Sequence, residues 1–305
     1  MKGVFQKADL LKKIKRLKCE KNAIILAHSY QRPEIYEVAD FVGDSLGLCI
    51  EASKTKADII IFCGVNFMAE SAVILNPGKK VVVPHSDAGC AMADMITPEG
   101  LKALKQKYPD AAVVAYVNSS AEVKALSDVC CTSSNAVEIV ASLPQKQIIF
   151  VPDRNLAAYV GSELPQKEII PWNGYCPAHN FVTKQMLEDV RKESPTAKII
   201  AHPESKKEVL DEADYVTSTS GMLDCARKDS GKEFFILTEC GMTERLQREL
   251  PAKKFRGLCN LCFDMKKNTL ESVCKALETE EDVVHVDKNV AAKALKAFER
   301  MFSAV

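Results

Sequence analysis

The chain alternates short apolar runs with amphipathic segments over most of its length. Runs such as "AIILAHSY" (23–30) and "ADIIIFCG" (57–64) are bounded by polar, turn-forming residues. Between such runs, apolar residues recur every three or four positions, as in "TPEGLKALKQK" (97–107). This alternation is typical of βαβ units on a parallel sheet. It predicts an α/β fold with an amphipathic helix over residues 1–18 and one more strand and helix within residues 281–302.

Three cysteines mark an internal repeat. They are spaced by 86 residues, and each lies in a loop that contains Gly or Asn: Cys90, Cys176 and Cys262. Seven residues after each cysteine stands a threonine that opens a helical pattern: Thr97, Thr183 and Thr269. The same lag overlays residues 112–136 on 198–222 and residues 147–154 on 233–240, which argues against a coincidence among twelve cysteines.

The repeat predicts three homologous three-layer α/β domains with parallel sheets around a pseudo-threefold axis, with the active site at the centre. The expected boundaries are residues 1–89 plus 264–305, residues 90–175, and residues 176–263. Ligands of open α/β sheets bind beyond the carboxyl ends of the strands. Three similar units around an axis would therefore bring one cysteine each to a common point.

Three thiolates indicate a particular kind of metal centre. A structural zinc site needs four ligands, whereas a 4Fe–4S cluster can be held by three cysteines with one iron left open. Such an iron is a Lewis acid for a substrate oxygen. Cys259 and Cys262 form the only C-x-x-C pair, no second pair completes a zinc ribbon, and the lag of 86 selects Cys262. We expect one 4Fe–4S cluster bound by Cys90, Cys176 and Cys262.

Polar groups recur where the first strand of each unit ends. These positions hold His28, Tyr116 and His202. At the ends of the second strands, Ser133 overlays Thr219. Hydroxyl groups at a helix start either bind anions, helped by the helix dipole, or only cap the helix. The two roles are compatible where the cap faces a cavity.

Composition narrows the class of protein. Lys plus Arg equals Asp plus Glu at 41 each, so nothing favours nucleic acid as a partner. No run of 18 apolar residues exists, which predicts no membrane span. In a reducing compartment most of the twelve cysteines should be buried thiols rather than disulfides, among them Cys19, Cys49, Cys63, Cys130, Cys131 and Cys274. We therefore expect a cytoplasmic protein.

Motifs spread along nearly the whole chain resemble those of the quinolinate synthases. They include "LAHSYQRPE", "CGVNFMAES", "PHSDAGCAMAD", "YVNSSAEVKALSD", "GYCPAH", "DYVTSTSGM" and "CFDMKKNTLES". The resemblance implies three homologous α/β domains around a 4Fe–4S cluster. It also implies condensation of iminoaspartate with dihydroxyacetone phosphate to quinolinate, a step of NAD biosynthesis, and a functional link to the enzyme that supplies iminoaspartate.

The resemblance also implies roles for individual residues. By matching motif, the cluster ligands would be the three 86-spaced cysteines. Tyr30 and Glu204 would be the acid–base candidates, with His28, His179 and His202 as further catalytic groups. The residues expected to line the substrate site are His28, Ser45, Tyr116, Asn118, Ser133, His202, Glu204, Ser218 and Thr219.

Three other functions fit part of the pattern. An aconitase-type hydro-lyase would use the same open iron on a single hydroxy acid, and a substrate assay separates it from the condensation. An iron–sulfur electron carrier or sensor would be expected to have four cysteine ligands and no organised polar pocket. An α/β binding protein with incidental thiols would purify colourless and without iron.

Overall fold

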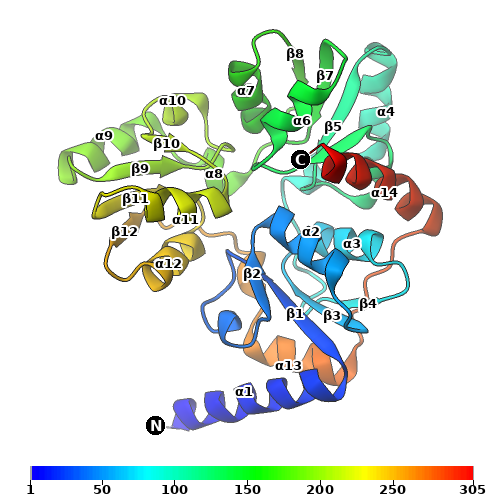
Figure 1. The fold of residues 1–305 in the computed structure, drawn as a ribbon, viewed down its shortest axis with the longest axis vertical. Helices are drawn as coiled ribbons and strands as arrows, with labels where there is room; N and C mark the ends of the chain where they lie inside the picture. The colour runs from blue at the N-terminus through cyan, green and yellow to red at the C-terminus, as the bar shows by residue number, and fades with distance from the viewer. Residues whose placement is uncertain (1, 305) are drawn as a thin grey trace. The chain divides into compact units, whose positions relative to one another are not determined.

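The computed structural model describes residues 2–304, with side chains described from residue 7 onward. Its strands form three four-stranded sheets, and every pair of neighbouring strands is parallel (Figure 1). The first sheet contains β1 (Ala23–His28), β2 (Phe41–Gly43), β3 (Ile59–Cys63) and β4 (Lys80–Val82). The second contains β5 (Ala112–Tyr116), β6 (Val129–Cys131), β7 (Gln147–Val151) and β8 (Glu168–Pro171). The third contains β9 (Lys198–Ala201), β10 (Tyr215–Val216), β11 (Glu233–Leu237) and β12 (Lys254–Gly257).

All three sheets have the same strand order. The orders are β2-β1-β3-β4, β6-β5-β7-β8 and β10-β9-β11-β12. The central strands are nearly continuous apolar runs and are buried, as expected for a parallel sheet covered on both faces. The α/β class and the three parallel sheets expected from the repeat are confirmed.

The chain divides into two compact units, which we describe separately. The first unit comprises Met1–Cys90 and Cys262–Ala291, and it holds the first sheet. The second comprises Ala91–Leu261 and Ala292–Val305, and it holds the other two sheets.

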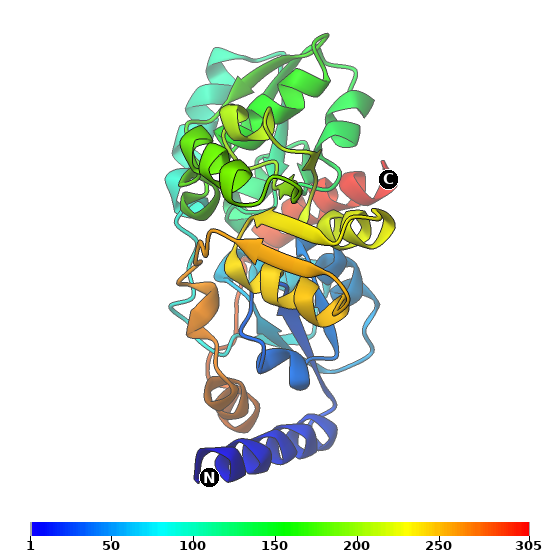
Figure 2. The same ribbon diagram turned by 90° about the vertical axis from the view of Figure 1, so that its left-hand side faces the viewer.

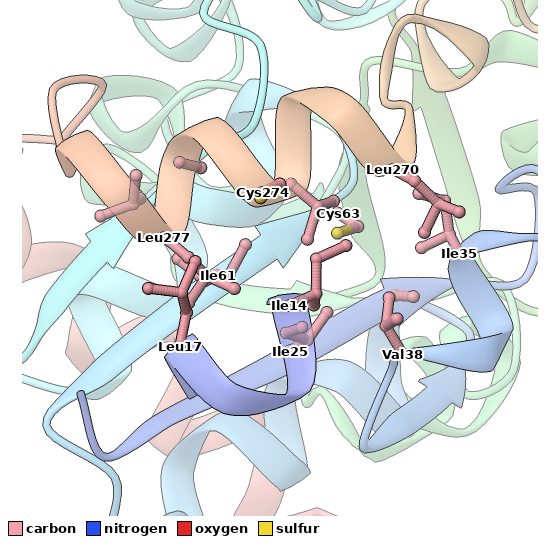
Figure 3. Close-up of a cluster of buried hydrophobic side chains, with 14 of the residues drawn as sticks. Ile14, Leu17, Ile25, Ile35, Val38, Ile61, Cys63, Leu270, Cys274 and Leu277 are labelled. Carbon is pink, nitrogen blue, oxygen red and sulfur yellow. The ribbon is translucent and has the colours of Figure 1, made fainter. Parts of the chain in front are cut away.

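The first sheet is covered by helices from both ends of the chain. On one side lie α1 (Lys2–Glu20) and α13 (Leu270–Thr279), which pack beside each other in the two views of Figures 1 and 2. On the other side lie α2 (Ser45–Lys54) and α3 (Asn66–Leu75) (Figure 1). Figure 3 shows Ile14 of α1, Ile61 of β3 and Leu277 of α13 meeting in one buried cluster. A segment near residue 270 thus completes the core of a sheet formed by the first 82 residues.

The second unit repeats this packing twice. The second sheet packs with α4 (Pro98–Lys107), α5 (Ala121–Ala125), α6 (Ala136–Ser142) and α7 (Arg154–Glu163). The third packs with α9 (Lys184–Glu193), α10 (Lys207–Leu210) and α12 (Cys240–Glu249), and α11 (Thr219–Lys228) lies beside β11 in Figure 1. The helix between the third and fourth strands has the same place in each sheet. It packs on the edge strand that follows it: α3 on β4, α7 on β8 and α12 on β12.

One partly buried hydrogen bond recurs between the first two strands of all three sheets. The residue that precedes the second strand is an aspartate, and its Oδ2 accepts from the backbone N–H of the first strand at 2.8 Å. The pairs are Asp40 with Ile25, Asp128 with Val113, and Asp214 with Ile199. The repeat therefore extends to side-chain contacts that tie neighbouring strands together.

The structure departs from the sequence-based expectation in two places. Residues 281–287 contain a single antiparallel bridge, Val82 with Val283, instead of the expected last strand, and the helix that follows is α14 (Lys288–Ser303). The short strand β2 was not expected, because three residues are too few to show a strand periodicity. The N-terminal helix α1 is confirmed. Among the helices of residues 2–304, none has the length and hydropathy needed to span a bilayer.

Candidate active site

The three 86-spaced cysteines lie in matching loops. Each follows the edge strand of a sheet, and each is half-buried: Cys90 after β4, Cys176 after β8 and Cys262 after β12. One short helical turn separates each cysteine from its threonine: η2 (Ala93–Met95), α8 (Pro177–Asn180) and η3 (Met265–Lys267). By contrast, Cys49, Cys63, Cys130, Cys131 and Cys274 are buried, as plain core thiols would be. Cys19 is exposed, so its expected burial is wrong, and five of the twelve cysteines are buried rather than most of them.

The threonines cap helices as predicted. The Thr97 hydroxyl accepts from the N–H of Gly100 at 3.1 Å, and that of Thr183 accepts from the N–H of Met186 at 3.4 Å. Thr269 and Ser272 form a reciprocal capping box at the start of α13. The local structure from cysteine to helix is therefore shared by all three repeats.

A buried polar cluster forms in the second unit around Glu204. The loop after β9 carries His202 and Glu204, and α8 carries His179 three residues after Cys176. His179 Nδ1 lies 2.5 Å from Glu204 Oε2, and His202 Nδ1 lies 3.5 Å from the same oxygen. The two imidazole rings stack with centroids 4.4 Å apart. All three side chains are at most 3% exposed, so they interact in a medium of low polarity.

Two further residues expected from the sequence join this cluster. The Ser133 hydroxyl lies 3.2 Å from His202 Nε2. The Tyr116 hydroxyl donates a hydrogen bond to the Glu204 carboxylate. The end of β5 and the loop after β6 thus both reach the loop after β9, at Glu204 and at His202 respectively, as the rule for strand ends predicts.

Charge is distributed unequally between two buried carboxyl groups. Burial acts to raise the pKa of Glu204, but the imidazoles of His179 and His202 outweigh it and lower that pKa to about 2. Asp153, also fully buried, shows the opposite result. Its burial and the nearby charge of Glu204 raise the pKa of Asp153 to about 7, against hydrogen bonds from the N–H groups of Leu156 and Cys176. Glu204 therefore stays ionised to a much lower pH than Asp153 does.

Several supporting residues were not predicted from the sequence. Asp153 Oδ2 accepts from the Cys176 N–H at 3.1 Å, and the Thr238 hydroxyl lies 2.7 Å from His179 Nε2. Asn155 donates to the Glu204 carbonyl at 3.0 Å, and Asn260 donates to the Ala178 carbonyl at 2.9 Å. The lag of 86 could have indicated one of these residues, Asp153. It overlays Glu239, and both are buried acidic residues directly before a helix.

One subset of the cluster has the donor atoms of a metal site. A thiol sulfur, an imidazole nitrogen and a carboxylate oxygen from Cys176, His179 and Glu204 all lie within 4.8 Å of one another. The spacing Cys-x-x-His places the first two on one side of α8. This set was not predicted as a group, although each member was a candidate by itself.

Three other predicted residues lie at loop and helix starts in the second unit. Asn118 follows β5, and its Oδ1 is buried without a hydrogen-bond partner among the described residues. Ser218 caps α11 by accepting from the Gly221 N–H, and Thr219 is the first residue of that helix. Ser133 does not cap a helix, since α6 starts after Asn135. The capping interpretation therefore applies to Ser218, while Ser133 contacts an imidazole.

The remaining predicted residues belong to the first unit. His28 ends β1, and its Nδ1 accepts from the Tyr30 N–H at 3.2 Å. The two rings meet edge to face with centroids 4.6 Å apart. Ser45 is the first residue of α2, which is capped by Asp44. Cys90 and Cys262 are the two half-buried cysteines of this unit.

Comparison with known proteins identifies the relatives of this chain. The family model described as "Quinolinate synthetase A protein" matches residues 12–303. A quinolinate synthase from Alkaliphilus metalliredigens is 52% identical over 299 residues, covering 97% of this chain and 99% of the relative. One from Methanosarcina barkeri is 50% identical over 301 residues, covering 98% and 99%. One from Thermodesulfovibrio yellowstonii is 49% identical over 297 residues, covering 97% and 98%.

Proposed function

This chain belongs to the quinolinate synthase family, and we propose that it condenses iminoaspartate with dihydroxyacetone phosphate. The products are quinolinate, phosphate and two molecules of water, which balances all atoms of the two substrates. The chain is then a condensing and dehydrating enzyme of the transferase class that serves NAD biosynthesis. A reaction that produces iminoaspartate must supply one substrate.

The observation that carries this proposal is the identical placement of three cysteines. Cys90, Cys176 and Cys262 are each half-buried in a loop beyond the carboxyl end of an edge strand, and each precedes a Thr-capped helix. Half-buried thiols in polar loops suit a 4Fe–4S cluster better than the buried core thiols do. We propose these three as its ligands. When bound, the cluster supplies a Lewis-acidic iron that has no protein ligand.

The substrates are anionic, and the neutral chain offers local positive potential for them. The hydroxyl groups of Ser133, Ser218 and Thr219 stand near helix starts, where N–H groups and the helix dipole favour anions. We propose that they bind carboxylate or phosphate oxygens together with His202. The buried Oδ1 of Asn118 supplies an acceptor for an N–H or O–H of the substrate.

Ring formation and loss of two waters require repeated proton transfers. Glu204 is ionised and lies 2.5 Å from His179 Nδ1, so this pair can accept a proton and share it. We assign Glu204 as the principal base, with His179 and His202 stabilising its charge. Tyr30, held beside His28, is the proposed second acid–base group, and Ser45 and His28 complete the proposed substrate-binding set.

We also propose that the chain is divided into three domains. Its segments are residues 1–89 plus 264–305, residues 90–175, and residues 176–263. The packing of α13 on the first sheet supports grouping residues 270–279 with the N-terminal strands, whereas residues 292–305 fall in the other compact unit.

Cluster analysis after anaerobic purification tests this function. We expect iron, sulfide and a 4Fe–4S spectrum in the natural chain, and loss of all three in Cys90→Ser, Cys176→Ser and Cys262→Ser. Cys63→Ser, at the end of β3, and Cys225→Ser, within α11, are the matched controls, and both should keep the cluster. An intact cluster in Cys176→Ser, or no quinolinate formed from the two substrates by cluster-loaded protein, would contradict the proposal.

A further inference from the structure

We propose that the chain without its cluster binds one divalent zinc-type cation through Cys176, His179 and Glu204. This site is distinct in composition from the cluster site, because it shares only Cys176 with it. The thiol, imidazole and carboxylate donors of the three residues lie within 4.8 Å of one another. One sulfur, one nitrogen and one oxygen donor match the borderline-soft preference of Zn²⁺, and three protein ligands leave a fourth position for solvent.

The backbone already places two of the ligands. Cys176 is the residue before α8 and His179 is the third residue of that helix, so the fold of this short turn fixes their spacing. Glu204 is fixed from the other side, since its carbonyl accepts from Asn155 at 3.0 Å and its N–H donates to His202 Nδ1 at 3.3 Å. Little chain entropy is therefore lost when a metal ion joins the three groups.

Outer contacts orient the ligands in the way that zinc sites require. A metal-bound histidine usually donates its second ring N–H to a fixed acceptor. With Nδ1 on the metal, His179 Nε2 would donate to the Thr238 hydroxyl, which lies 2.7 Å away and is buried. Asp153 holds the backbone of the cysteine ligand through the Cys176 N–H at 3.1 Å.

Only a small movement separates the observed geometry from a coordinated one. With zinc–ligand distances of about 2.0–2.3 Å, ligand atoms in a tetrahedral site lie roughly 3.3–3.8 Å apart. The His179 Nδ1 to Glu204 Oε2 distance of 2.5 Å must therefore open by less than about 1 Å, as the metal replaces the shared proton. Cys176 is half-buried, so its side chain can change rotamer to close on the ion.

This site has a consequence for cluster assembly. A thiolate bound to zinc is not available to iron, so the two metal centres exclude each other. That consequence rests on the proposed role of Cys176 as a cluster ligand, whereas binding of the cation itself does not. Zinc would thus hold the chain in a state that cannot accept the cluster until the ion is removed.

Cobalt(II) titration of the full chain purified without cluster tests the site directly. We expect one Co²⁺ per chain with a thiolate-to-cobalt charge-transfer band, displaced by Zn²⁺. The band should disappear in Cys176→Ser, and the dissociation constant should rise at least about tenfold in Glu204→Gln and His179→Ala. Cys90→Ser and Cys262→Ser are matched controls from the equivalent loops, and their affinity should change less than about twofold. Circular dichroism confirms that each variant is folded, and His179→Gln replaces His179→Ala if the latter is not.

Three outcomes would overturn the proposal. One is an equal loss of the band in Cys90→Ser, which would mean that the cobalt uses the cluster cysteines. The second is an unchanged affinity in both Glu204→Gln and His179→Ala, and the third is no thiolate band at all.

Cluster reconstitution after loading with Zn²⁺ tests the consequence: it should be blocked in the natural chain, restored by a chelator, and unblocked in His179→Ala. Unimpeded reconstitution of zinc-loaded chain would refute mutual exclusion, while failure of reconstitution without zinc would count against the proposed function instead.

Discussion

The loops after β1 and β9 have the same backbone and different chemistry. In both, a histidine at the strand end accepts, through Nδ1, from the N–H two residues later: Tyr30 to His28 at 3.2 Å and Glu204 to His202 at 3.3 Å. In both, the histidine carbonyl also accepts from the third residue, Gln31 at 3.0 Å and Ser205 at 2.9 Å. The repeat has therefore kept one turn and changed the group that it presents, a phenol in one loop and a carboxylate in the other.

The surroundings of the two loops explain why the groups differ in function. His202 stacks on a second imidazole, and both imidazoles face the Glu204 carboxylate, which keeps that carboxylate ionised. His28 instead meets the edge of the Tyr30 ring, and the Tyr30 carbonyl accepts from Lys266 at 2.6 Å. A shared turn thus specifies where a side chain is placed, and its neighbours specify its charge.

The largest expected effect comes from neutralising the carboxylate in the β9 loop. Glu204→Gln keeps the shape of the side chain and most hydrogen bonds but removes the base. We expect a folded protein that retains its cluster and binds substrate, with turnover reduced at least about 100-fold, the usual scale for a positioned acid–base group. Steady-state kinetics of quinolinate formation, with cluster content measured on the same sample, gives the result.

The matched change in the β1 loop is Tyr30→Phe, which removes the phenol proton and keeps the ring. Its loss of turnover should respond differently to pH from that of Glu204→Gln, because a phenol and a carboxylate titrate far apart. Near-normal turnover in a stable Glu204→Gln protein would move the base from Glu204 to Tyr30 or a histidine.

The second prediction concerns the middle repeat, where Asn118 stands at the position of Tyr30 and Glu204. An amide can bind substrate but does not carry protons at neutral pH. Asn118→Ala should therefore weaken substrate binding by roughly 1–3 kcal/mol, as for a lost buried hydrogen bond, with a smaller change in turnover. A fall in turnover with unchanged substrate affinity would show that this position acts in the chemistry instead.

The sequence was sufficient to predict the repeated architecture and much of the candidate site. The lag of 86 located Tyr116 and His202, which contact Glu204, and Ser133, which contacts His202, because equivalent strand ends occupy equivalent places in each sheet. It did not locate Thr238 as a partner of His179. These residues are 59 positions apart, and their contact depends on how α8 packs beside the end of β11. Periodicity specifies position within a repeat but not contacts between loops of different repeats.

Thr238 tests that missed contact. The Thr238 hydroxyl lies 2.7 Å from His179 Nε2, and this contact holds the ring in the orientation that turns Nδ1 toward the Glu204 carboxylate. Thr238→Val should lower turnover by roughly 3- to 10-fold with little change in KM, the scale of one hydrogen bond. Thr238→Ser should restore most of the activity. If the serine variant is as impaired as the valine variant, the threonine acts through packing and not through its hydroxyl group.

The smallest expected effect concerns the aspartates that accept a hydrogen bond from the strand preceding each loop. Asp214 accepts from the N–H of Ile199, which lies in β9 before the loop. Asp40 accepts in the same way from the N–H of Ile25 in β1. Burial acts to raise the pKa of Asp214, but the Ile199 N–H and the Arg191 guanidinium outweigh it, so that pKa lies below its ordinary value. A carboxyl with a lowered folded-state pKa stabilises the fold above its unfolded pKa, and this stabilisation is lost as pH falls through the folded pKa.

Asp214→Asn should therefore reduce the free energy of unfolding by about 1 kcal/mol at neutral pH, since the side chain is partly exposed and its ion pair contributes little. The difference from the natural chain should shrink as the pH falls below about 4. Urea unfolding at several pH values measures it, with Asp40→Asn as the matched variant of the first repeat. Turnover should stay within about twofold in both variants. The same hydrogen bond recurs in all three sheets, so it stabilises the strand pair and does not depend on whether the loop carries Tyr30 or Glu204. A large loss of turnover in Asp214→Asn alone would show that the β9 loop needs a more exact backbone than the β1 loop.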